Sequence, residues 1–414
     1  MAHKLMRALI LSQYFWPEDF RINDVARTLK DKGIEVEVLT GKPNYPKGVV
    51  YDGYRAWGCQ SEDFHGILVH RVPLISRGRG GWRLALNYLS FVVSGILFAP
   101  WMLRGKKYDA IFVYAPSPIL QAIPAIFLGW LKGCPVVLWV QDLWPESLSA
   151  TGHVKNRAVL RIVEYVVRFI YRHVDLLLAQ SEAFIAPIEV LASGTPVRYL
   201  PNSVDENFLK PATADAPQIA GLEAGFSVMF AGNIGSAQAV EVIVEAAELL
   251  KDHEDIQFVV LGDGSRREWM LQQAGERKLS NLHLPGRFPV DTMPGFMRRA
   301  SVLLVTLADQ EIFRYTVPSK VQAYLAAGRP ILACLNGEGA RLIEDASAGI
   351  AVPAEDGHAL AEAVLRMYRM PQAKRDEMGG NGRLYYVKHF SHDMLVDQLI
   401  GHLQSACQSK EKSE

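Results

Sequence analysis

The stretch SVMFAGNIGSAQAVEVIVEAAELL, residues 227–250, decides the fold. It begins with a short apolar run, passes through a turn of small residues, and ends in a pattern typical of an amphipathic helix. An apolar run without polar alternation is typical of a strand buried on both faces, so residues 227–231 predict an interior strand of a parallel sheet. Residues 240–250 predict a helix that covers one face of that sheet.

The same alternation of apolar runs and helical stretches continues in both halves of the chain. Strands are predicted in the first half at residues 5–12, 35–40, 67–72, 110–114, 136–140, 175–179 and 198–200. In the second half they are predicted at 227–231, 257–261, 282–284, 302–306, 331–334 and 349–352. Helices are predicted between them at 24–32, 118–131, 158–173, 240–250, 266–274, 321–327 and 359–367. Two such series in 414 residues predict two doubly wound, Rossmann-like α/β domains with a boundary at 201–217.

The charge and the cysteines exclude several classes of protein. The 44 basic residues balance the 44 acidic residues, and a general nucleic-acid binder needs a basic surplus, so no nucleic-acid partner is expected. Cys59, Cys134, Cys334 and Cys407 are far apart and form no CxxC pair, which predicts reduced thiols in a cytosolic protein. The first residues run into a predicted strand and lack the pattern of a signal peptide.

Small residues follow the strand predicted at 227–231, in the turn Gly232-Asn233-Ile234-Gly235-Ser236. Such a turn before a helix, which is expected to begin near Gln238, exposes backbone N–H groups and can hold a phosphate. A plain strand-to-helix turn explains the same residues equally well. The triplet Gly262-Asp263-Gly264 lacks the third glycine of a dinucleotide fingerprint, and a tight turn is its favoured interpretation.

Lys320 is a second candidate for phosphate binding. It lies just after Pro318 and Ser319, which are start signals for a helix. A lysine in the first turn of a helix opposes the helix dipole by about a few tenths of a kcal/mol, and an anionic ligand at that end would reverse the sign. A solvated lysine is the alternative.

The residues that follow the strand predicted at 136–140 place an amide and two carboxylates at the carboxyl edge of the first sheet: Gln141, Asp142 and Glu146. Paired carboxylates serve as acid and base in glycoside chemistry. The alternative is that Asp142 caps a turn and Glu146 is solvated, and the functional interpretation is favoured for Gln141 and Asp142. After the first strand, residues 14–18 contain no glycine, which argues against a dehydrogenase.

Residues 82–103, WRLALNYLSFVVSGILFAPWML, are nearly uncharged and long enough to span a bilayer. Six basic residues lie within or beside this segment: Arg77, Arg79, Arg83, Arg104, Lys106 and Lys107. The α/β pattern resumes at residue 108, so we interpret the segment as a surface helix whose apolar face enters the membrane interface. A buried helix explains the leucines but not the basic flanks. Residues 77–107 are therefore expected to bind an anionic membrane surface.

Over essentially its full length, the chain resembles the retaining glycosyltransferases of family 4, which have the GT-B fold. Six stretches carry the resemblance: residues 14–27, VQDLWPES (140–147), LPNSVD (200–205), FAGNIGSAQ (230–238), VVLGDGSRR (259–267) and PSKVQAYLAAGRPILA (318–333). Bacterial members that build O-antigen or capsule repeats look most similar, N-acetyl-L-fucosamine transferases among them.

The resemblance implies two Rossmann-like domains that face each other across a cleft. The acceptor-binding domain is expected at 1–203, the nucleotide-sugar-binding domain at 204–388, and a helix at 389–405 that packs back on the first domain. The implied reaction moves an N-acetylated amino sugar, such as N-acetyl-L-fucosamine, from a UDP-sugar to a polyprenyl-pyrophosphate-linked acceptor. The enzyme is expected on the cytoplasmic face of the membrane, in lipopolysaccharide O-antigen or capsule synthesis, without a metal or other cofactor.

The resemblance also implies roles for particular residues. It places the donor pyrophosphate at Gly232, Asn233, Gly235, Ser319 and Lys320, the uracil beside Arg287 and Phe288, and the ribose at Gln322. Gln141 stands where many relatives have a histidine that faces the donor sugar, so the catalytic candidates are Lys320, Gln141 and Asp142. On the acceptor side, Phe20 and Arg21 replace a glycine pair.

The chain departs from the family at the usual Glu-x7-Glu pair, since Arg314 stands at the first position and Gln322 at the second. Two alternative functions stay open. A UDP-sugar 2-epimerase of the GT-B fold would need a carboxylate and a histidine for proton transfer. A non-catalytic, membrane-associated relative is supported only by the missing glutamate pair.

Overall fold

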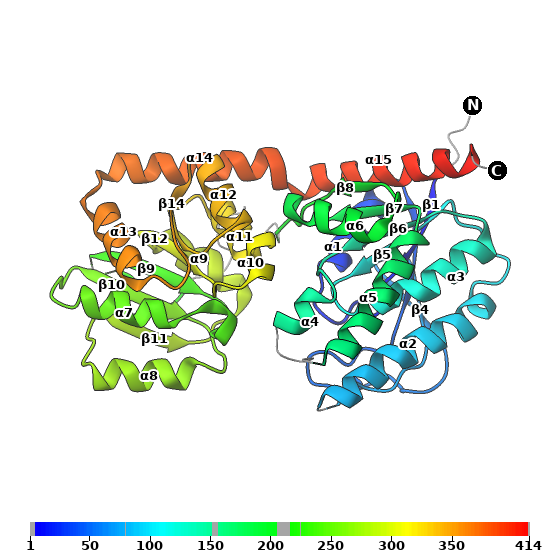
Figure 1. Ribbon diagram of the computed structural model, residues 1–414, viewed down its shortest axis with the longest axis horizontal. Helices are drawn as coiled ribbons and strands as arrows, with labels where there is room; N and C mark the ends of the chain where they lie inside the picture. The colour runs from blue at the N-terminus through cyan, green and yellow to red at the C-terminus, as the bar shows by residue number, and fades with distance from the viewer. Residues whose placement is uncertain (1–4, 79, 151–155, 205–215, 224, 413–414) are drawn as a thin grey trace. The chain divides into compact units, whose positions relative to one another are not determined.

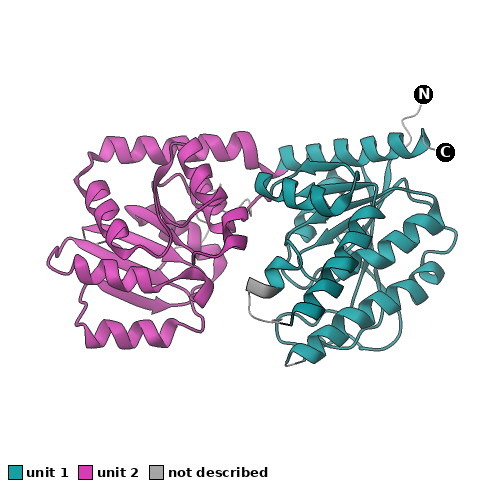
Figure 2. Ribbon diagram, in the orientation of Figure 1, with its two compact units in different colours: residues 1–201, 393–414 teal, residues 202–392 magenta. Residues whose placement is uncertain are grey.

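The computed structural model describes residues 5–78, 80–150, 156–204, 216–223 and 225–412. The chain forms two compact units (Figure 2): Met1–Pro201 with Asp393–Glu414 is unit 1, and Asn202–His392 is unit 2. The boundary predicted between residues 203 and 204 thus lies between 201 and 202, inside the predicted segment 201–217. Of that segment, residues 205–215 lie outside the described residues, as does Arg79.

Unit 1 contains an eight-stranded sheet with the order β3-β4-β2-β1-β5-β6-β7-β8. All neighbouring pairs are parallel except β3 and β4, which are antiparallel. Its strands are β1 (Arg7–Leu11), β2 (Glu35–Thr40), β3 (Gln60–Phe64), β4 (Ile67–Arg71), β5 (Ala110–Ala115), β6 (Val136–Val140), β7 (Leu176–Ala179) and β8 (Val197–Tyr199). Residues of β1, β5 and β6 are almost all buried, as the apolar runs predicted.

Helices cover both faces of this sheet (Figure 1). On one face, α1 (Ile22–Asp31) and the C-terminal helix α15 (His392–Glu411) pack against alternate strand residues. A separate row contains α2 (Gly81–Met102), α3 (Ala122–Lys132), α5 (Arg157–Arg172) and α6 (Ile185–Ala192), each in contact with the next. The short α4 (Glu146–Ala150) follows β6. The returning helix predicted to start at residue 389 therefore begins at His392, and α15 packs on unit 1.

Unit 2 contains a parallel six-stranded sheet with the order β11-β10-β9-β12-β13-β14. Its strands are β9 (Phe226–Ala231), β10 (Ile256–Leu261), β11 (Leu282–Gly286), β12 (Val302–Thr306), β13 (Ile331–Cys334) and β14 (Gly349–Val352). One face is covered by α7 (Glu241–Leu249), α8 (Arg267–Glu276) and α13 (Gly357–Arg369). The other is covered by α9 (Met293–Arg299), α11 (Ser319–Ala327), α12 (Glu338–Asp345) and α14 (Gln372–Phe390). The short α10 (Glu311–Tyr315) precedes α11.

Both sheets are doubly wound, as predicted. The order of unit 2 is the Rossmann order 3-2-1-4-5-6, and β4-β2-β1-β5-β6-β7 has the same pattern in unit 1. Every predicted strand is present within about two residues of its predicted ends. The sequence reasoning missed β3, whose residues QSEDF are polar because the strand lies at the edge of the sheet. It also missed the helices α6, α9, α12 and α14 and the short helices α4 and α10.

A chain of buried amide side chains ties α2 to the loops at the carboxyl edge of unit 1. Gln13 Nε2 donates to Asn87 Oδ1 at 2.7 Å, and Asn87 Nδ2 donates to Ile75 O at 2.6 Å. Gln121 Oε1 accepts from the Gln13 N–H at 2.6 Å. Gln13, Asn87 and Gln121 are fully buried. The one buried polar residue that α2 contains therefore fixes the turn that follows β1.

We expect Asn87→Leu to lower the free energy of unfolding by about 2–4 kcal/mol, because it leaves Gln13 Nε2 and Ile75 O without their partner in a buried site. Urea unfolding followed by circular dichroism measures the change. Leu89→Asn, at an exposed position of the same helix, is the control and should change the stability by less than about 0.5 kcal/mol. Equal effects of the two substitutions would contradict the proposed role of the network.

Candidate active site

Each sheet has one point at which the strand order reverses. In unit 1 it lies between β1 and β5, and in unit 2 between β9 and β12. Ligands of open parallel sheets bind at such a point, outside the carboxyl ends of the strands. The turn after β9 and the start of α11 contain the predicted phosphate residues, so unit 2 holds a candidate site where the topology expects one.

The turn after β9 depends on glycine at two positions. Gly232 has φ +134°, and Gly262, at the end of the neighbouring β10, has φ +140°. A Cβ atom on Gly262 would lie 1.8 Å from Gly232 O, and one on Gly232 would lie 2.5 Å from Lys320 Cε. Only glycine permits this contact between the two turns. Residues 262–264 lie in the connection between β10, which ends at Leu261, and α8, which begins at Arg267.

Most backbone donors of this turn are already paired. The N–H groups of Gly232 and Ile234 donate to Leu261 O and Asp263 O, both at 2.9 Å. Gln238 Oε1 accepts from the Gly235 N–H and from Asn233 Nδ2, both at 3.1 Å. The turn therefore offers fewer free donors to a phosphate than a cradle of exposed N–H groups would.

The helix after this turn begins later than predicted. A 3-10 turn covers Ser236–Gln238, Ala239 follows with φ +43°, and α7 begins at Glu241. The helix predicted at 240–250 is confirmed as α7, but the expectation that it begins near Gln238 is wrong, because the left-handed Ala239 interrupts the backbone before the α-helical hydrogen bonds start. The phosphate argument from a helix N-terminus then applies to α11 rather than to α7.

Lys320 lies in the first turn of α11, as predicted from Pro318 and Ser319. Its Nζ lies 3.5 Å from the ring centroid of Phe230 in β9. This nitrogen is buried, and among the described residues nothing accepts a hydrogen bond from it. One helical turn further, the buried hydroxyl of Tyr324 accepts from the Ala231 N–H at 3.1 Å. One face of α11 thus fixes both the lysine and the end of β9, and the solvated alternative is wrong.

Burial lowers the pKa of Lys320 from 10.5 to about 7. The aromatic face of Phe230 attracts the ammonium group but supplies no hydrogen-bond acceptor. A diphosphate beside Nζ would provide acceptors and negative charge, and would favour the protonated lysine. A buried cation without an acceptor, at the switch point of a parallel sheet, is the arrangement expected of an anion-binding site.

The other predicted donor residues lie in varied surroundings. Ser319 and Arg287 are exposed, and Phe288 packs on Phe296 with ring centroids 4.8 Å apart. Gln322 is 1% exposed, and its Nε2 donates to Asn202 O at 2.7 Å. Because Gln322 is two residues from Lys320, it lies on a different face of α11. Its amide nitrogen has a structural partner, and its contact with the ribose stays a prediction.

Arg314, which stands at the first position of the family's glutamate pair, forms an ion pair. Its Nη2 lies 2.9 Å from Asp309 Oδ1. Asn336 Nδ2 donates to the same oxygen at 3.0 Å. This position therefore presents a paired guanidinium rather than a free carboxylate.

In unit 1, Asp142 follows β6 at the carboxyl edge of the sheet. Burial raises the pKa of Asp142 to about 6. Three tyrosine hydroxyl groups interact with it electrostatically: Tyr88, Tyr114 and Tyr171. A carboxyl group that changes protonation near neutral pH is suited to accept or donate a proton. Gln141 is partly buried beside it, whereas Glu146 is exposed, as its solvated interpretation requires.

An aromatic cluster surrounds the predicted acceptor-side residues. The rings of Tyr14 and Phe20 are stacked with centroids 5.1 Å apart, and the ring of Tyr45 lies 5.3 Å from that of Phe20. Arg77 covers Tyr45 at 5.3 Å. Arg21 directly precedes α1 and interacts electrostatically with Tyr114. The end of β1 thus presents stacked rings and cations in place of the family's glycines.

The sequence reasoning missed Glu18, which is almost fully buried. It accepts hydrogen bonds from the N–H groups of Asn44 at 2.7 Å, Tyr45 at 2.6 Å and Phe15 at 3.3 Å. Burial raises the pKa of Glu18 to about 7. The only signal in the sequence is an acidic residue inside the aromatic segment 14–18. Glu18 holds the loop after β2 against the turn after β1.

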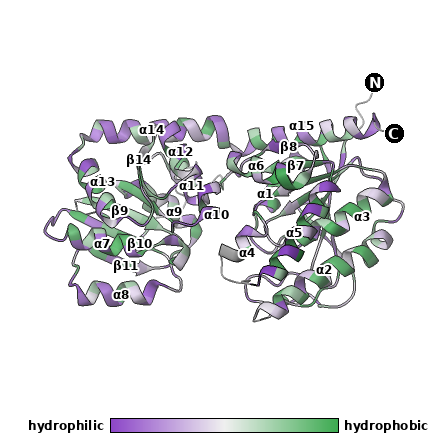
Figure 3. Ribbon diagram, viewed as in Figure 1, coloured by the Kyte–Doolittle hydropathy of each residue, from purple (hydrophilic) through white to green (hydrophobic). Residues whose placement is uncertain are grey.

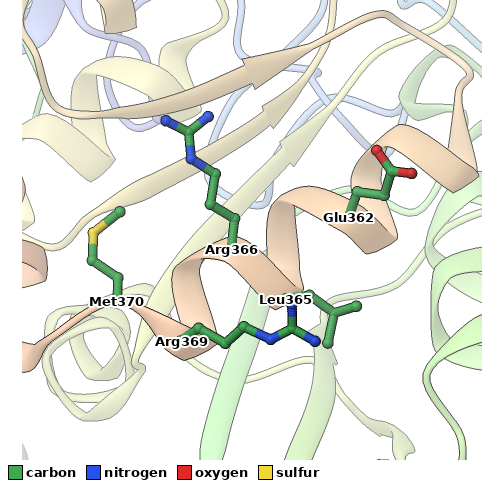
Figure 4. A pocket seen from close by; sticks show the side chains of 5 residues that line it. All are labelled: Glu362, Leu365, Arg366, Arg369 and Met370. Atoms are coloured by element: carbon green, nitrogen blue, oxygen red, sulfur yellow. The ribbon is translucent and has the colours of Figure 1, made fainter.

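A pocket of about 410 Å³ lies along α13 (Figure 4). It is lined by Glu362, Leu365, Arg366, Arg369 and Met370, and it contains none of the predicted site residues. Within the described part of the chain, no group of three or more His, Cys, Asp or Glu residues could hold a metal ion. Independence from metals stays a prediction.

Comparison with known proteins defines the class. Residues 20–203 match the glycosyl transferase 4-like domain, and residues 225–370 match the domain described as glycosyl transferases group 1. The chain is 27% identical over 323 residues to the probable glycosyltransferase WbjE of Pseudomonas aeruginosa, covering 76% of this chain and 80% of the relative. It is 26% identical over 322 residues to the putative colanic acid biosynthesis glycosyl transferase WcaI of Escherichia coli K12, covering 74% and 76%.

Solved structures share the fold over the whole chain. Sucrose-phosphate synthase from Thermosynechococcus elongatus superposes with a TM-score of 0.75 at 15% identity, covering 98% of this chain and 100% of that one. Anabaena HepE, solved with UDP and glucose, superposes with a TM-score of 0.67 at 15% identity, covering 97% and 100%. The protein is therefore a glycosyltransferase with the GT-B fold. It combines a glycosyl transferase 4-like domain in unit 1 with a group 1 domain in unit 2.

We expect Lys320→Met to raise the melting temperature at pH 6, because it removes a buried charge. The folded pKa lies near 7 and the unfolded pKa at 10.5, so the unfolded wild type binds more protons between these values and its stability rises with pH there. The advantage of the variant should therefore shrink between pH 7 and pH 9. Differential scanning fluorimetry across this range measures it, with exposed Lys251→Met as the control. An advantage that is constant with pH would contradict the assignment.

Gln322→Leu separates a structural role from a contact with the ribose. We expect a loss of about 1–3 kcal/mol in unfolding free energy, because Asn202 O loses its donor, whereas a contact with the ribose would weaken the binding of UDP. Thermal unfolding and calorimetric titration with UDP give the two readouts. Unchanged stability with more than about tenfold weaker binding would instead establish the ribose contact.

Proposed function

We propose that this glycosyltransferase moves a sugar, with retention of anomeric configuration, from a UDP-sugar to a lipid-linked acceptor. Anabaena HepE, which shares the fold, was solved with UDP and glucose, and this supports a nucleotide-sugar donor. The relative named for colanic acid biosynthesis supports a role in bacterial surface polysaccharide synthesis. The sequence resembles N-acetyl-L-fucosamine transferases. We therefore propose that the transferred sugar is an N-acetylated amino sugar and that the acceptor is linked to polyprenyl pyrophosphate.

The buried ammonium group of Lys320 carries the donor half of this proposal. Negative charge develops on the leaving diphosphate as the bond to the sugar breaks. A cation held at that position, with no acceptor of its own among the described residues, stabilises the charge without having to exchange a partner. Gly232 allows the approach because a side chain there would occupy the space beside Lys320 Cε.

Asp142 carries the acceptor half. With a pKa near 6, a large part of the carboxyl population is ionised at neutral pH and can accept the proton of an attacking hydroxyl group. The stacked rings of Tyr14 and Phe20 offer an apolar surface for the acceptor. We assign no enzyme nucleophile, and we propose that Gln141 faces the donor sugar. Both units match glycosyltransferase domains, and this favours a transferase over an epimerase.

A membrane location follows from a lipid-linked acceptor. By length and composition, helix α2 could cross a bilayer. Only 28% of its most apolar 18 residues are buried in the protein, so most of this segment is accessible to a membrane. We propose that residues 77–107 bind the anionic surface of the cytoplasmic leaflet, with the basic flanks toward lipid headgroups. The enzyme is then peripheral and needs no metal or other cofactor.

Lys320→Ala tests the donor half. We expect a loss of about 2–4 kcal/mol of transition-state stabilisation in kcat/KM, the size typical of removing one group that stabilises a developing anion. Lys320→Arg should recover part of the loss, because it restores the charge. Steady-state kinetics with the natural donor give both values. Activity of Lys320→Ala within about threefold of wild type, which is less than about 1 kcal/mol, would sink the assignment.

The decisive experiment for the whole proposal is a screen of UDP-sugars against a polyprenyl-pyrophosphate-linked sugar, read by mass spectrometry. Transfer of one sugar with retention supports the proposal. A 2-epimerised nucleotide sugar in the absence of acceptor would support the epimerase instead. Donor binding without either product would support the non-catalytic relative.

A further inference from the structure

Helix α5 presents a stripe of large apolar side chains to the solvent. Val159, Ile162, Tyr165 and Phe169 are all exposed, Ile162 by 65% and Tyr165 by 73%. Their spacing of three or four residues places them on one face of the helix. The buried face of α5 is a different set, Val167, Ile170 and Tyr171. The exposed stripe is therefore additional to the one that packs on the sheet.

The helices α3 and α2 of the same row also expose large apolar side chains. Helix α3 contacts both α5 and α2, and it exposes Trp130 by 78%. Helix α2 exposes a tryptophan in its first turn and another in its last, Trp82 and Trp101. Figure 3 shows hydrophobic residues along much of α2 and α3. A row of three adjacent helices with apolar outer residues exceeds what an isolated soluble surface normally exposes.

The charges on these helices are positive with one exception. Helix α5 carries Arg157, Arg161, Arg168 and Arg172, at spacings of four and seven residues that place them along a second face. Along the described residues of α2, α3 and α5, the only acidic side chain is Glu164, which pairs with Arg168 at 2.7 Å. An apolar stripe beside a basic stripe matches the boundary of a bilayer with anionic headgroups.

We infer that α5, with Trp130 of α3, forms a second membrane-binding element beside α2, so that this row of helices rests on an anionic lipid surface. This rests on the proposed function, which places only residues 77–107 at the membrane. The side chains of Ile162, Tyr165 and Phe169 enter the interface, and Arg157 and Arg161 contact the headgroups. A second copy of the chain is the other occupant to exclude, and the excess of arginine disfavours it because two such faces repel.

Co-sedimentation with phosphatidylcholine vesicles, with and without phosphatidylglycerol, tests the inference. We expect the triple variant Ile162→Ser, Tyr165→Ser, Phe169→Ser to bind anionic vesicles at least about fivefold more weakly than wild type. The matched control is Leu249→Ser, Leu384→Ser, Val387→Ser, three exposed apolar positions in unit 2, which should bind like wild type. The double variant Arg157→Gln, Arg161→Gln should weaken binding to anionic vesicles only. It replaces the triple variant as the test if thermal unfolding shows that the triple variant is not folded.

The outcomes separate this inference from the proposed function. If the wild type, the triple variant and the arginine variant all sediment equally well, α5 has no role in membrane binding. Residues 77–107 then remain as the binding element. Wild type that stays in the supernatant at low salt overturns the inference, while the sugar-transfer assay still decides the reaction. Wild type that is dimeric by light scattering, with a monomeric triple variant and unchanged vesicle binding, makes the face a contact between two copies and also overturns it.

Discussion

The parallel pairing of buried strands is the constraint on which the functional features depend. Parallel strands bring their carboxyl ends to one edge, and the register decides which turns meet there. In unit 2, Ala231 of β9 pairs with Leu261 of β10, so the two strands end at the same level. Gly232 and Gly262 then come into backbone contact, and both must be glycine. The space left over the end of β9 is the space that the stem of Lys320 fills.

Two buried cations in this protein, Arg71 and Lys320, differ in whether their charge is paired. Arg71 in unit 1 is fully buried, but its Nε lies 2.5 Å from Glu62 Oε1 and its Nη1 donates to Gly41 O at 2.9 Å. Among the described residues, Lys320 Nζ has no hydrogen-bond acceptor and lies against the face of the Phe230 ring. A satisfied buried cation adds to the specificity of the fold, whereas one without an acceptor lowers stability unless a ligand completes it. The fold retains this unfavourable contact because α11 is anchored independently through Tyr324.

The sequence predicts the features that local patterns determine, such as interior strands and helix starts. It does not predict features that depend on distant residues, such as edge strands and the burial of single side chains. The apolar runs located every interior strand, and Pro318 and Ser319 located the start of α11. The polar edge strand β3 and the glycine-containing helix α14 escaped because tertiary packing creates them: a Cβ at Gly379 of α14 would lie 2.3 Å from Gly328 O. The burial of Glu18 and the partner of Gln322 likewise depend on residues 26 and 120 positions away. The sequence places Lys320 in the first turn of a helix, but its burial depends on a contact with Phe230 of the distant strand β9.

Helix α2 has buried polar contacts on its inner face and exposed apolar residues on its outer face. Three residues that interrupt its apolar sequence lie toward the protein: Asn87 bonds to Gln13, Ser90 Oγ accepts from the Ile75 N–H at 3.0 Å, and a Cβ at Gly95 would lie 2.8 Å from Pro124 of α3. Tyr88 of the same helix interacts electrostatically with Asp142. A helix that crossed a bilayer would give up these contacts and leave buried amide groups without partners, which is costly in lipid. The inner face therefore favours a helix that stays on unit 1, and its polar residues link it to the turn after β1 and to the surroundings of Asp142.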